Sequence, residues 1–136
     1  MLDRNKAERI AVVLLRIVAG LMFVCVGGMK LFGWFGGMPG GMTLSLFSEI
    51  GLAGILEVFG GAAIVLGAFT RPVAFILSGE MAVAYFQGHQ PHGLLPIQNH
   101  GEQAVLYCFI FLFFAAHGAG DFSVDALIGR RRGANP

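Results

Sequence analysis

The chain has 136 residues, of which 56% are apolar and only 12% are charged, and its formal net charge is +1. A soluble domain contains about twice this share of charged residues, so the composition argues against a soluble globular protein. A mean hydropathy of +0.74 and a content of 21 glycines are instead typical of membrane-spanning helices.

Four apolar runs predict four membrane-spanning helices in a single domain over residues 1–136. We expect these helices over about residues 10–31, 51–69, 73–87 and 102–119. A Gly/Pro-rich connector with Trp34 follows the first run, and a tight turn at Thr70–Pro72 precedes the third. The predicted fold is therefore an all-α, integral membrane four-helix bundle.

The distribution of basic residues predicts how this bundle is oriented. Four crossings place both termini and the Thr70–Pro72 turn on one side, and the Trp34 connector on the other. The first side carries Arg4, Lys6, Arg9, Arg71, Arg130, Arg131 and Arg132, whereas the second carries only Lys30. Because basic residues accumulate in cytoplasmic loops, we expect cytoplasmic termini and an inner-membrane location. We interpret Arg130–Arg132 as a stop signal for membrane insertion or a contact with anionic lipid, rather than as a nucleic-acid site.

A polar segment interrupts the apolar sequence between the third and fourth runs. It contains His89, His92, Asn99, His100 and Glu102. Hydrocarbon cannot satisfy such groups, so we expect this loop to cover a polar site at the outer surface. The three histidines with Glu102 offer nitrogen and oxygen ligands for a metal, but their spacing matches no diagnostic motif. We therefore predict no metal, and a metal site is left as an alternative.

Ionisable residues also fall within the apolar runs, where such groups usually face the interior of a bundle. Helical spacing places Arg16 and Lys30 on one face of the first helix, and Glu57 among small residues on one face of the second. On the third helix, Glu80 shares a face with Ala84 and Gln87. On the fourth, Glu102 shares a face with Leu106, Phe109 and Phe113. If these faces turn toward the interior of the bundle, they form one water-accessible pocket that opens to the outer side of the membrane.

The charges of this pocket do not balance. Three carboxylates, Glu57, Glu80 and Glu102, face the two cations Arg16 and Lys30. One carboxyl group is therefore expected to hold a proton, unless a histidine supplies the missing positive charge. We predict that the three glutamates are catalytic and handle protons. The predicted ligand-binding residues are Arg16, Lys30, His92, Asn99 and His100. A salt-bridge network that only fixes the helix register is the alternative interpretation.

The two cysteines are not expected to line this pocket. Helical spacing places Cys25 opposite Arg16 and places Cys108 away from Glu102. A disulfide between the first and fourth helices is left open. Aromatic residues near the polar groups would suit recognition of a quinone, which a histidine or glutamate can hydrogen-bond. They are Tyr85, Phe86, Tyr107, Phe109 and Phe113.

Several motifs resemble the DoxX family of small bacterial membrane proteins. They are Arg16-x-x-x-Gly20, Gly27/Gly28-Met29-Lys30, Glu57-Val58-Phe59-Gly60-Gly61, Leu66-Gly67-x-x-Thr70-Arg71, His92-Gly93-Leu94-Leu95-Pro96 and Asn99-x-Gly101-Glu102. The resemblance runs from about Glu8 to Asp125 and implies a four-span bundle of the cytoplasmic membrane. It marks Arg16, Lys30, Glu57, Arg71, Asn99 and Glu102 as motif positions. His100 stands where a small residue is expected, and His89 and His92 are additional, so a ligand preference of its own is left open.

Some members of this family are subunits of a thiosulfate:quinone oxidoreductase, and others are linked to redox homeostasis. The resemblance therefore implies a quinone-linked redox subunit or redox-accessory protein. Because the sequence contains no haem, flavin or iron–sulfur motif, electrons would come from a bound quinone, the candidate cofactor, or from a partner redox subunit. The first alternative is a small-molecule or proton-coupled carrier, expected as a homo-oligomer in the lipid bilayer. The second is a non-catalytic scaffold for a membrane redox complex.

Overall fold

The computed structural model describes residues 3–40 and 45–133, which are helical and contain no β-strand. The α-helices in chain order are α1 (Arg4–Phe32), α2 (Glu49–Leu66), α3 (Thr70–Ala84), α4 (Pro96–Asn99), α5 (Glu102–His117) and α6 (Val124–Gly133). The all-α prediction is therefore confirmed for the described residues. Of the predicted Trp34 connector, residues 34–36 form a short 3₁₀ turn, and residues 41–44 lie outside the described residues.

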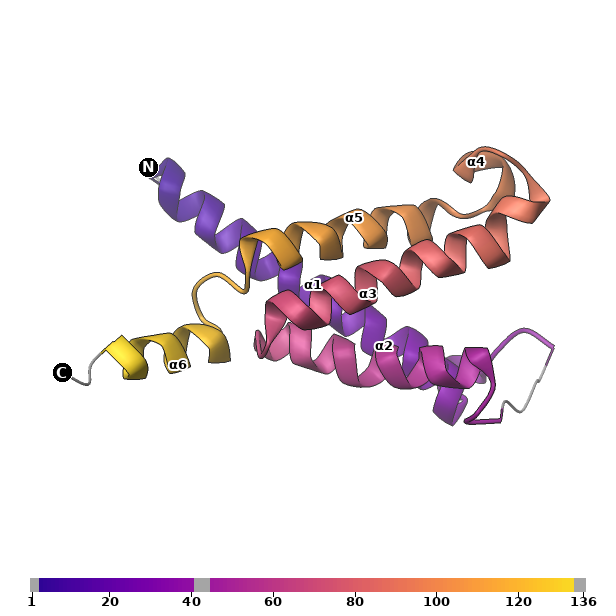
Figure 1. Cartoon of the computed structure of the whole chain (residues 1–136), viewed down its shortest axis with the longest axis horizontal. Helices are drawn as coiled ribbons and strands as arrows, with labels where there is room; N and C mark the ends of the chain where they lie inside the picture. Colours follow the sequence, from indigo (N-terminus) through magenta and orange to yellow (C-terminus); the bar gives the residue numbers. More distant parts are fainter. Residues whose placement is uncertain (1–2, 41–44, 134–136) are drawn as a thin grey trace.

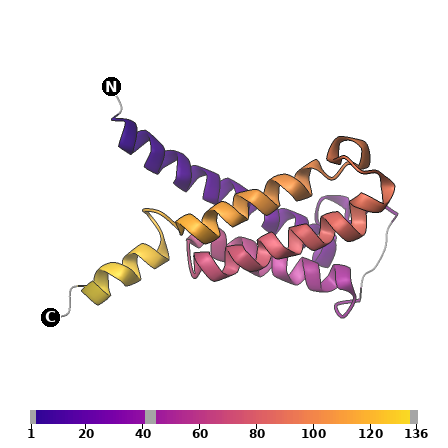
Figure 2. The same cartoon turned by 45° about the horizontal axis from the view of Figure 1, so that its top comes forward.

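The long helices pack as two hairpins, because α1 lies mainly against α2 and α3 mainly against α5. Figure 1 shows the start of α1, the α2–α3 turn and α6 at one end of the molecule, and α4 at the other. In Figure 2, α3 and α5 again run side by side, and α1 crosses behind them at an angle. The start of α1, the α2–α3 turn and α6 therefore share one end of the molecule, and the predicted membrane orientation stays a prediction.

The helix boundaries differ from the predicted spans where particular residues start or stop a helix. α1 extends beyond its predicted start at residue 10 and begins at Arg4. α2 ends at Leu66 instead of residue 69, because Gly67 adopts a left-handed conformation (φ 65°) that terminates the helix. α3 starts at Thr70 and continues into a π-helical turn over Tyr85–His89, past the predicted end at residue 87.

Glycines set the distance between α1 and α2. A Cβ atom added to Gly27 would lie 2.7 Å from the carbonyl oxygen of Gly54, and one added to Gly61 would lie 2.8 Å from that of Gly20. Neither space accommodates a methyl group, so the two backbones are in direct contact. The predicted small-residue face of the second helix is therefore confirmed as a surface for close packing.

The predicted orientation of the last apolar helix is wrong. Leu106, Phe109 and Phe113, which share a face with Glu102, are 62%, 64% and 42% exposed, while Phe111 and Phe114 are fully buried. Phe111 packs edge-on against Phe23 of α1, with 4.6 Å between the ring centroids. Because α5 is apolar on every side, its sequence offers no contrast from which to choose the inward face.

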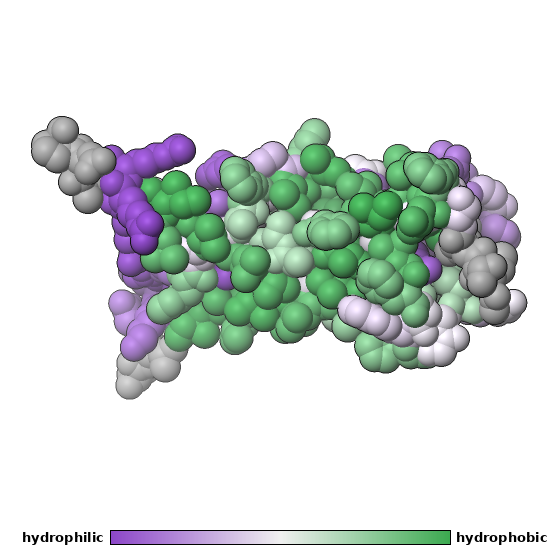
Figure 3. Space-filling view, turned by 90° about the horizontal axis from the view of Figure 1, so that it is seen from below, coloured by the Kyte–Doolittle hydropathy of each residue, from purple (hydrophilic) through white to green (hydrophobic). Residues whose placement is uncertain are grey.

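The outer surface of the helices is apolar. Large exposed side chains such as Leu14, Phe59, Phe75 and Phe109 project from all four long helices. The face shown in Figure 3 has a broad apolar zone, and its most hydrophilic residues gather at the end that holds the start of α1 and α6. By length and composition α1 and α2 suffice to cross a membrane, and α5 is apolar but has only 16 residues.

Candidate functional site

The close approach of α1 and α2 brings Lys30 to Glu57. Lys30 lies in the last turn of α1. It faces Gly54 of α2, which is one turn before Glu57: a Cβ added at Gly54 would lie 3.3 Å from the Lys30 Cβ. The Lys30 Nζ atom donates a hydrogen bond to Glu57 Oε1 at 2.6 Å. The two side chains are 17% and 2% exposed, so this ion pair is largely withdrawn from solvent. The second carboxylate oxygen, Oε2, is buried and has no hydrogen-bond partner within residues 3–40 and 45–133.

Glu80 of α3 lies beside this pair. Leu77 of α3 fills the space over Gly60 of α2, because a Cβ added at Gly60 would be 2.8 Å from a Leu77 methyl carbon. Because α2 and α3 are antiparallel, moving one turn toward the α4 end leads from Gly60 to Glu57 on α2 and from Leu77 to Glu80 on α3. The two glutamates therefore lie at the same level. The charges of Glu57 and Lys30 both act on the Glu80 carboxyl group. Both oxygens of that group are buried without a hydrogen-bond partner among the described residues.

Arg16 is not part of this cluster. Its side chain is 1% exposed and lies where α1 passes the end of α2 and the connection between α5 and α6. The guanidinium donates hydrogen bonds to the carbonyl oxygens of Ala119 and Phe122, the latter at 2.9 Å. Its charge interacts with Asp125, which lies at the start of α6. Within the described part of the chain, no ion pair connects Arg16 to a glutamate.

Asn99 organises the loop between α3 and α5. Its Nδ2 atom donates hydrogen bonds to the carbonyl oxygen of Gly93 at 2.8 Å and to the Tyr85 hydroxyl at 3.3 Å. Its Oδ1 atom accepts a hydrogen bond from the Gly101 backbone N–H at 2.9 Å. Asn99 is 6% exposed, so the amide holds the loop in its folded shape directly before Glu102.

The remaining predicted loop residues are spread over the end of the molecule that holds α4. Nδ1 of His89 lies 3.1 Å from the Asn99 carbonyl oxygen, and Nδ1 of His92 lies 3.1 Å from that of Gly88. His92 and His100 are exposed, and Glu102 is half-buried in the first turn of α5. In residues 3–40 and 45–133 no three His, Cys, Asp or Glu side chains are arranged to hold a metal. No ion pair there connects Glu102 to Lys30.

One cysteine and two of the predicted aromatic residues lie on the surface of the protein. Both cysteines are free, and Cys25 is exposed on α1 as its spacing predicted. The Ser78 hydroxyl donates a hydrogen bond to the Cys108 carbonyl oxygen at 2.8 Å. Phe86 and Phe109 are 64% exposed and face away from the protein interior. These two rings therefore do not enclose the buried cluster.

Sequence reasoning missed the polar contacts that attach α6 to the rest of the molecule. The Asp125 carboxylate accepts hydrogen bonds from the backbone N–H groups of Phe69 and Thr70, at 2.8 and 2.9 Å. The Ser123 hydroxyl accepts one from Ala126 at 3.1 Å and so caps α6. A serine directly before a helix-forming run is a start signal, and it predicts a helix beyond residue 119, where the last of the four predicted spans ends.

Comparison with known proteins gives a consistent result. A sequence model described as DoxX matches residues 11–90. An uncharacterized protein of Haemophilus influenzae is 41% identical over 114 residues, covering 82% of this chain and 85% of that protein. The inner membrane protein YqjF of Escherichia coli is 28% identical over 143 residues, covering 93% of this chain and 98% of that protein. No solved structure matches the chain.

Proposed function

Because the chain belongs to the DoxX family of membrane proteins, we propose that it crosses the inner membrane four times as a bundle of α1, α2, α3 and α5. The apolar outer surface of these helices supports this proposal, as does the inner-membrane name of the E. coli relative. The termini would be cytoplasmic, since α6 and the start of α1 carry most of the basic residues. The Lys30–Glu57–Glu80 cluster would then lie in the outer half of the membrane.

We further propose that this cluster holds an exchangeable proton. Two carboxyl groups share one ammonium group, so the neutral cluster contains one proton. A second buried carboxylate without a partner would be strongly destabilising. The observation that carries the proposal is the Glu80 carboxyl group beside an existing ion pair: both of its oxygens are buried and have no hydrogen-bond partner in the described part of the chain. Glu80 would carry the proton, Glu57 would accept it, and Lys30 would balance the remaining charge.

We propose that the cluster supplies its proton to a quinone-linked redox reaction. Reduction of a quinone to a quinol consumes two electrons and two protons. A partner redox subunit would deliver the electrons, and the cluster would deliver protons from within the membrane. The family resemblance supports this role, because some members are subunits of a thiosulfate:quinone oxidoreductase. Glu102, half-buried at the outer end, would connect the cluster with the solvent.

Infrared spectroscopy of the purified protein in liposomes tests the proton, and quinone binding tests the reaction. We expect a band from a protonated carboxyl group that Glu80→Gln removes and that Glu49→Gln leaves unchanged. Glu49 is a suitable control because it is an exposed glutamate in the first turn of α2. Retention of quinone and the rate of quinone reduction should fall in Glu57→Gln but not in Glu49→Gln.

The outcomes separate the alternatives. A band that persists in both Glu57→Gln and Glu80→Gln would refute the proton site. Loss of the band without any effect on quinone would refute the redox role and leave a proton-coupled carrier, for which Glu80→Gln should abolish pH-dependent flux. If Glu57→Gln lowers only stability, the cluster is structural and the protein is a scaffold.

A further inference from the structure

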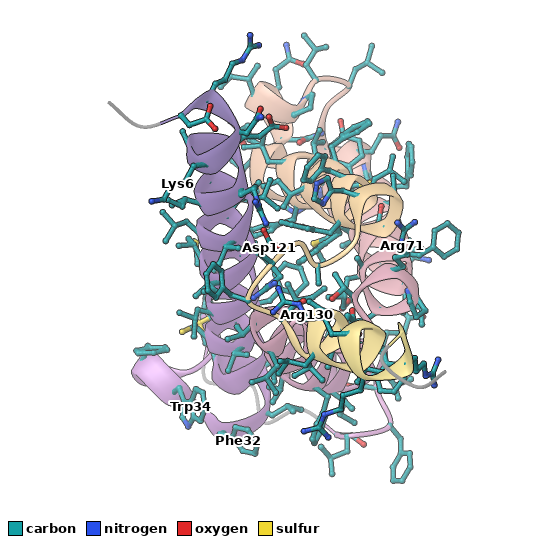
Figure 4. The ribbon with its side chains drawn as sticks, turned by 90° about the vertical axis from the view of Figure 1, so that its left-hand side faces the viewer. Lys6, Phe32, Trp34, Arg71, Asp121 and Arg130 are labelled. Carbon is teal, nitrogen blue, oxygen red and sulfur yellow. The ribbon has the colours of Figure 1, made fainter. Side chains whose placement is uncertain are left out.

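A groove of about 760 Å³ lies at the end of the molecule opposite the Lys30–Glu57 pair. The first turns of α1, the end of α2 and the segment from Asp121 to Arg130 form its walls. Figure 4 looks onto this end, where Lys6 projects from α1, Arg130 belongs to α6, and Asp121 lies in the connection before α6. The groove therefore joins segments that are far apart in the sequence.

The floor of the groove is apolar. Ile10, Leu66 and Leu127 line it, and their side chains are 40%, 59% and 59% exposed. Each comes from a different helix: α1, α2 and α6. Exposed large apolar side chains that line a groove together with charged residues favour hydrocarbon as part of the occupant.

The rim of the groove has an excess of positive charge. Lys6, Arg9 and Arg130 stand there with two acidic residues, Asp3 and Asp121. Arg9 forms an ion pair with Asp121, which neutralises both groups. In the part of the chain that the structure describes, neither Lys6 nor Arg130 forms an ion pair. Two further exposed cations, Arg131 and Arg132, follow Arg130 on α6.

We propose that this groove binds an anionic glycerophospholipid of the surrounding membrane. Its phosphate would lie near Lys6 and Arg130, and the start of an acyl chain would cover Ile10, Leu66 and Leu127. A soluble anion would leave the apolar floor uncovered, and a zwitterionic lipid would not match the excess of positive charge. Because the two cations belong to different helices, the lipid would also hold α6 against α1. This site goes beyond the proposed redox function and does not depend on it.

The test measures lipid binding to the full-length protein in a neutral detergent. The probes are short-chain phosphatidylglycerol, short-chain phosphatidylcholine and inorganic phosphate. The double variant Lys6→Gln/Arg130→Gln removes the two groove cations. The matched control is Arg4→Gln/Arg132→Gln, which removes the same charge from exposed positions that do not line the groove. Leu127→Ser tests the floor, and melting temperatures without lipid check that each variant is folded.

We expect phosphatidylglycerol to bind more tightly than phosphatidylcholine. The groove double variant should weaken phosphatidylglycerol binding about 30-fold, as expected for the loss of two cations at a membrane surface. Leu127→Ser should weaken both lipids. The proposal is overturned if the control pair weakens phosphatidylglycerol as much as the groove pair does, because the attraction would then be diffuse. It is equally overturned if inorganic phosphate competes as well as the lipid, or if the two lipids bind alike.

Discussion

Single glycines decide whether Lys30 can reach Glu57. The ion pair requires α1 and α2 to touch along their backbones, and this contact runs through Gly20, Gly27, Gly54 and Gly61. An alanine at any of these positions would push the helices apart by the width of a methyl group. The geometry of the buried charges therefore depends on residues that carry no functional group of their own.

Gly27→Ala should destabilise the protein by about 1–3 kcal/mol, since the added methyl meets backbone atoms that cannot move aside. Its Cβ would lie 2.7 Å from both the Gly54 carbonyl oxygen and the Val58 backbone nitrogen. The control is Gly79→Ala on α3, where nothing lies within 4 Å and stability should be unchanged or slightly raised. Denaturant unfolding in detergent measures both. Equal losses in the two variants would contradict backbone contact at Gly27.

The Arg9–Asp121 ion pair gives a second prediction at the residue scale. The hydrogen bond and charge of Arg9 lower the pKa of Asp121 below its ordinary value of 3.8, with a smaller contribution from Arg130. A lowered carboxyl pKa contributes stability that is present above the ordinary pKa and is lost as the pH falls through the lowered pKa. The difference in melting temperature between the protein and Asp121→Asn should therefore be small, and should disappear in the range below about pH 4. A difference that grows on acidification would contradict this assignment.

At the scale of elements, α6 is attached by polar contacts to the start of α3. Phe69 directly precedes α3, and Thr70 is its first residue. The backbone N–H groups at the start of a helix have no partner within the helix. Asp125 accepts hydrogen bonds from both, and its own backbone N–H donates one to the Gly67 carbonyl oxygen at 2.9 Å. A carboxylate is also favourable at a helix N-terminus because of the helix dipole. One side chain of α6 thus serves as the cap of another helix.

Asp125→Ala should lower the free energy of unfolding by about 2 kcal/mol, because two backbone donors lose a charged acceptor. Hydrogen exchange at the Phe69 and Thr70 amides should accelerate in the same variant. Asp3→Ala is the matched control, because Asp3 precedes α1 and makes no side-chain capping hydrogen bond. If Asp3→Ala costs as much as Asp125→Ala, or if the two amides stay protected, the capping role is refuted.

At the scale of the whole molecule, the two ends differ in charge while the surface between them is apolar. The end that holds the start of α1 and α6 carries clustered basic residues, and the α4 end carries exposed polar residues such as His92 and His100. Such an asymmetry orients a membrane protein. The four-crossing proposal therefore assigns a definite side of the membrane to each connecting segment.

Cysteine labelling in intact cells checks these assignments. In a variant with both native cysteines replaced by alanine, Ile97→Cys in α4 should react with a membrane-impermeant thiol reagent. Lys6→Cys and Arg132→Cys should react only after the membrane is permeabilised. Ile97 is 71% exposed, so protein packing does not shield it. Reaction at position 132 in intact cells would refute the proposed orientation or the crossing by α5.

The sequence by itself determined the helical class, the positions of the apolar helices and the packing face of α2. These follow from local signals, since small residues and one acid on an otherwise apolar helix mark a single face. The tertiary structure alone decided that Lys30 pairs with Glu57 while Arg16 binds backbone carbonyls. Spacing along a helix gives the face of a charge but not which residue of a neighbouring helix stands at its level. Likewise, Phe111 of α5 faces the protein interior and Phe109 does not. Lipid and protein core both accommodate apolar side chains, so only the contact of Phe111 with Phe23 and its neighbours decides which face of α5 is buried.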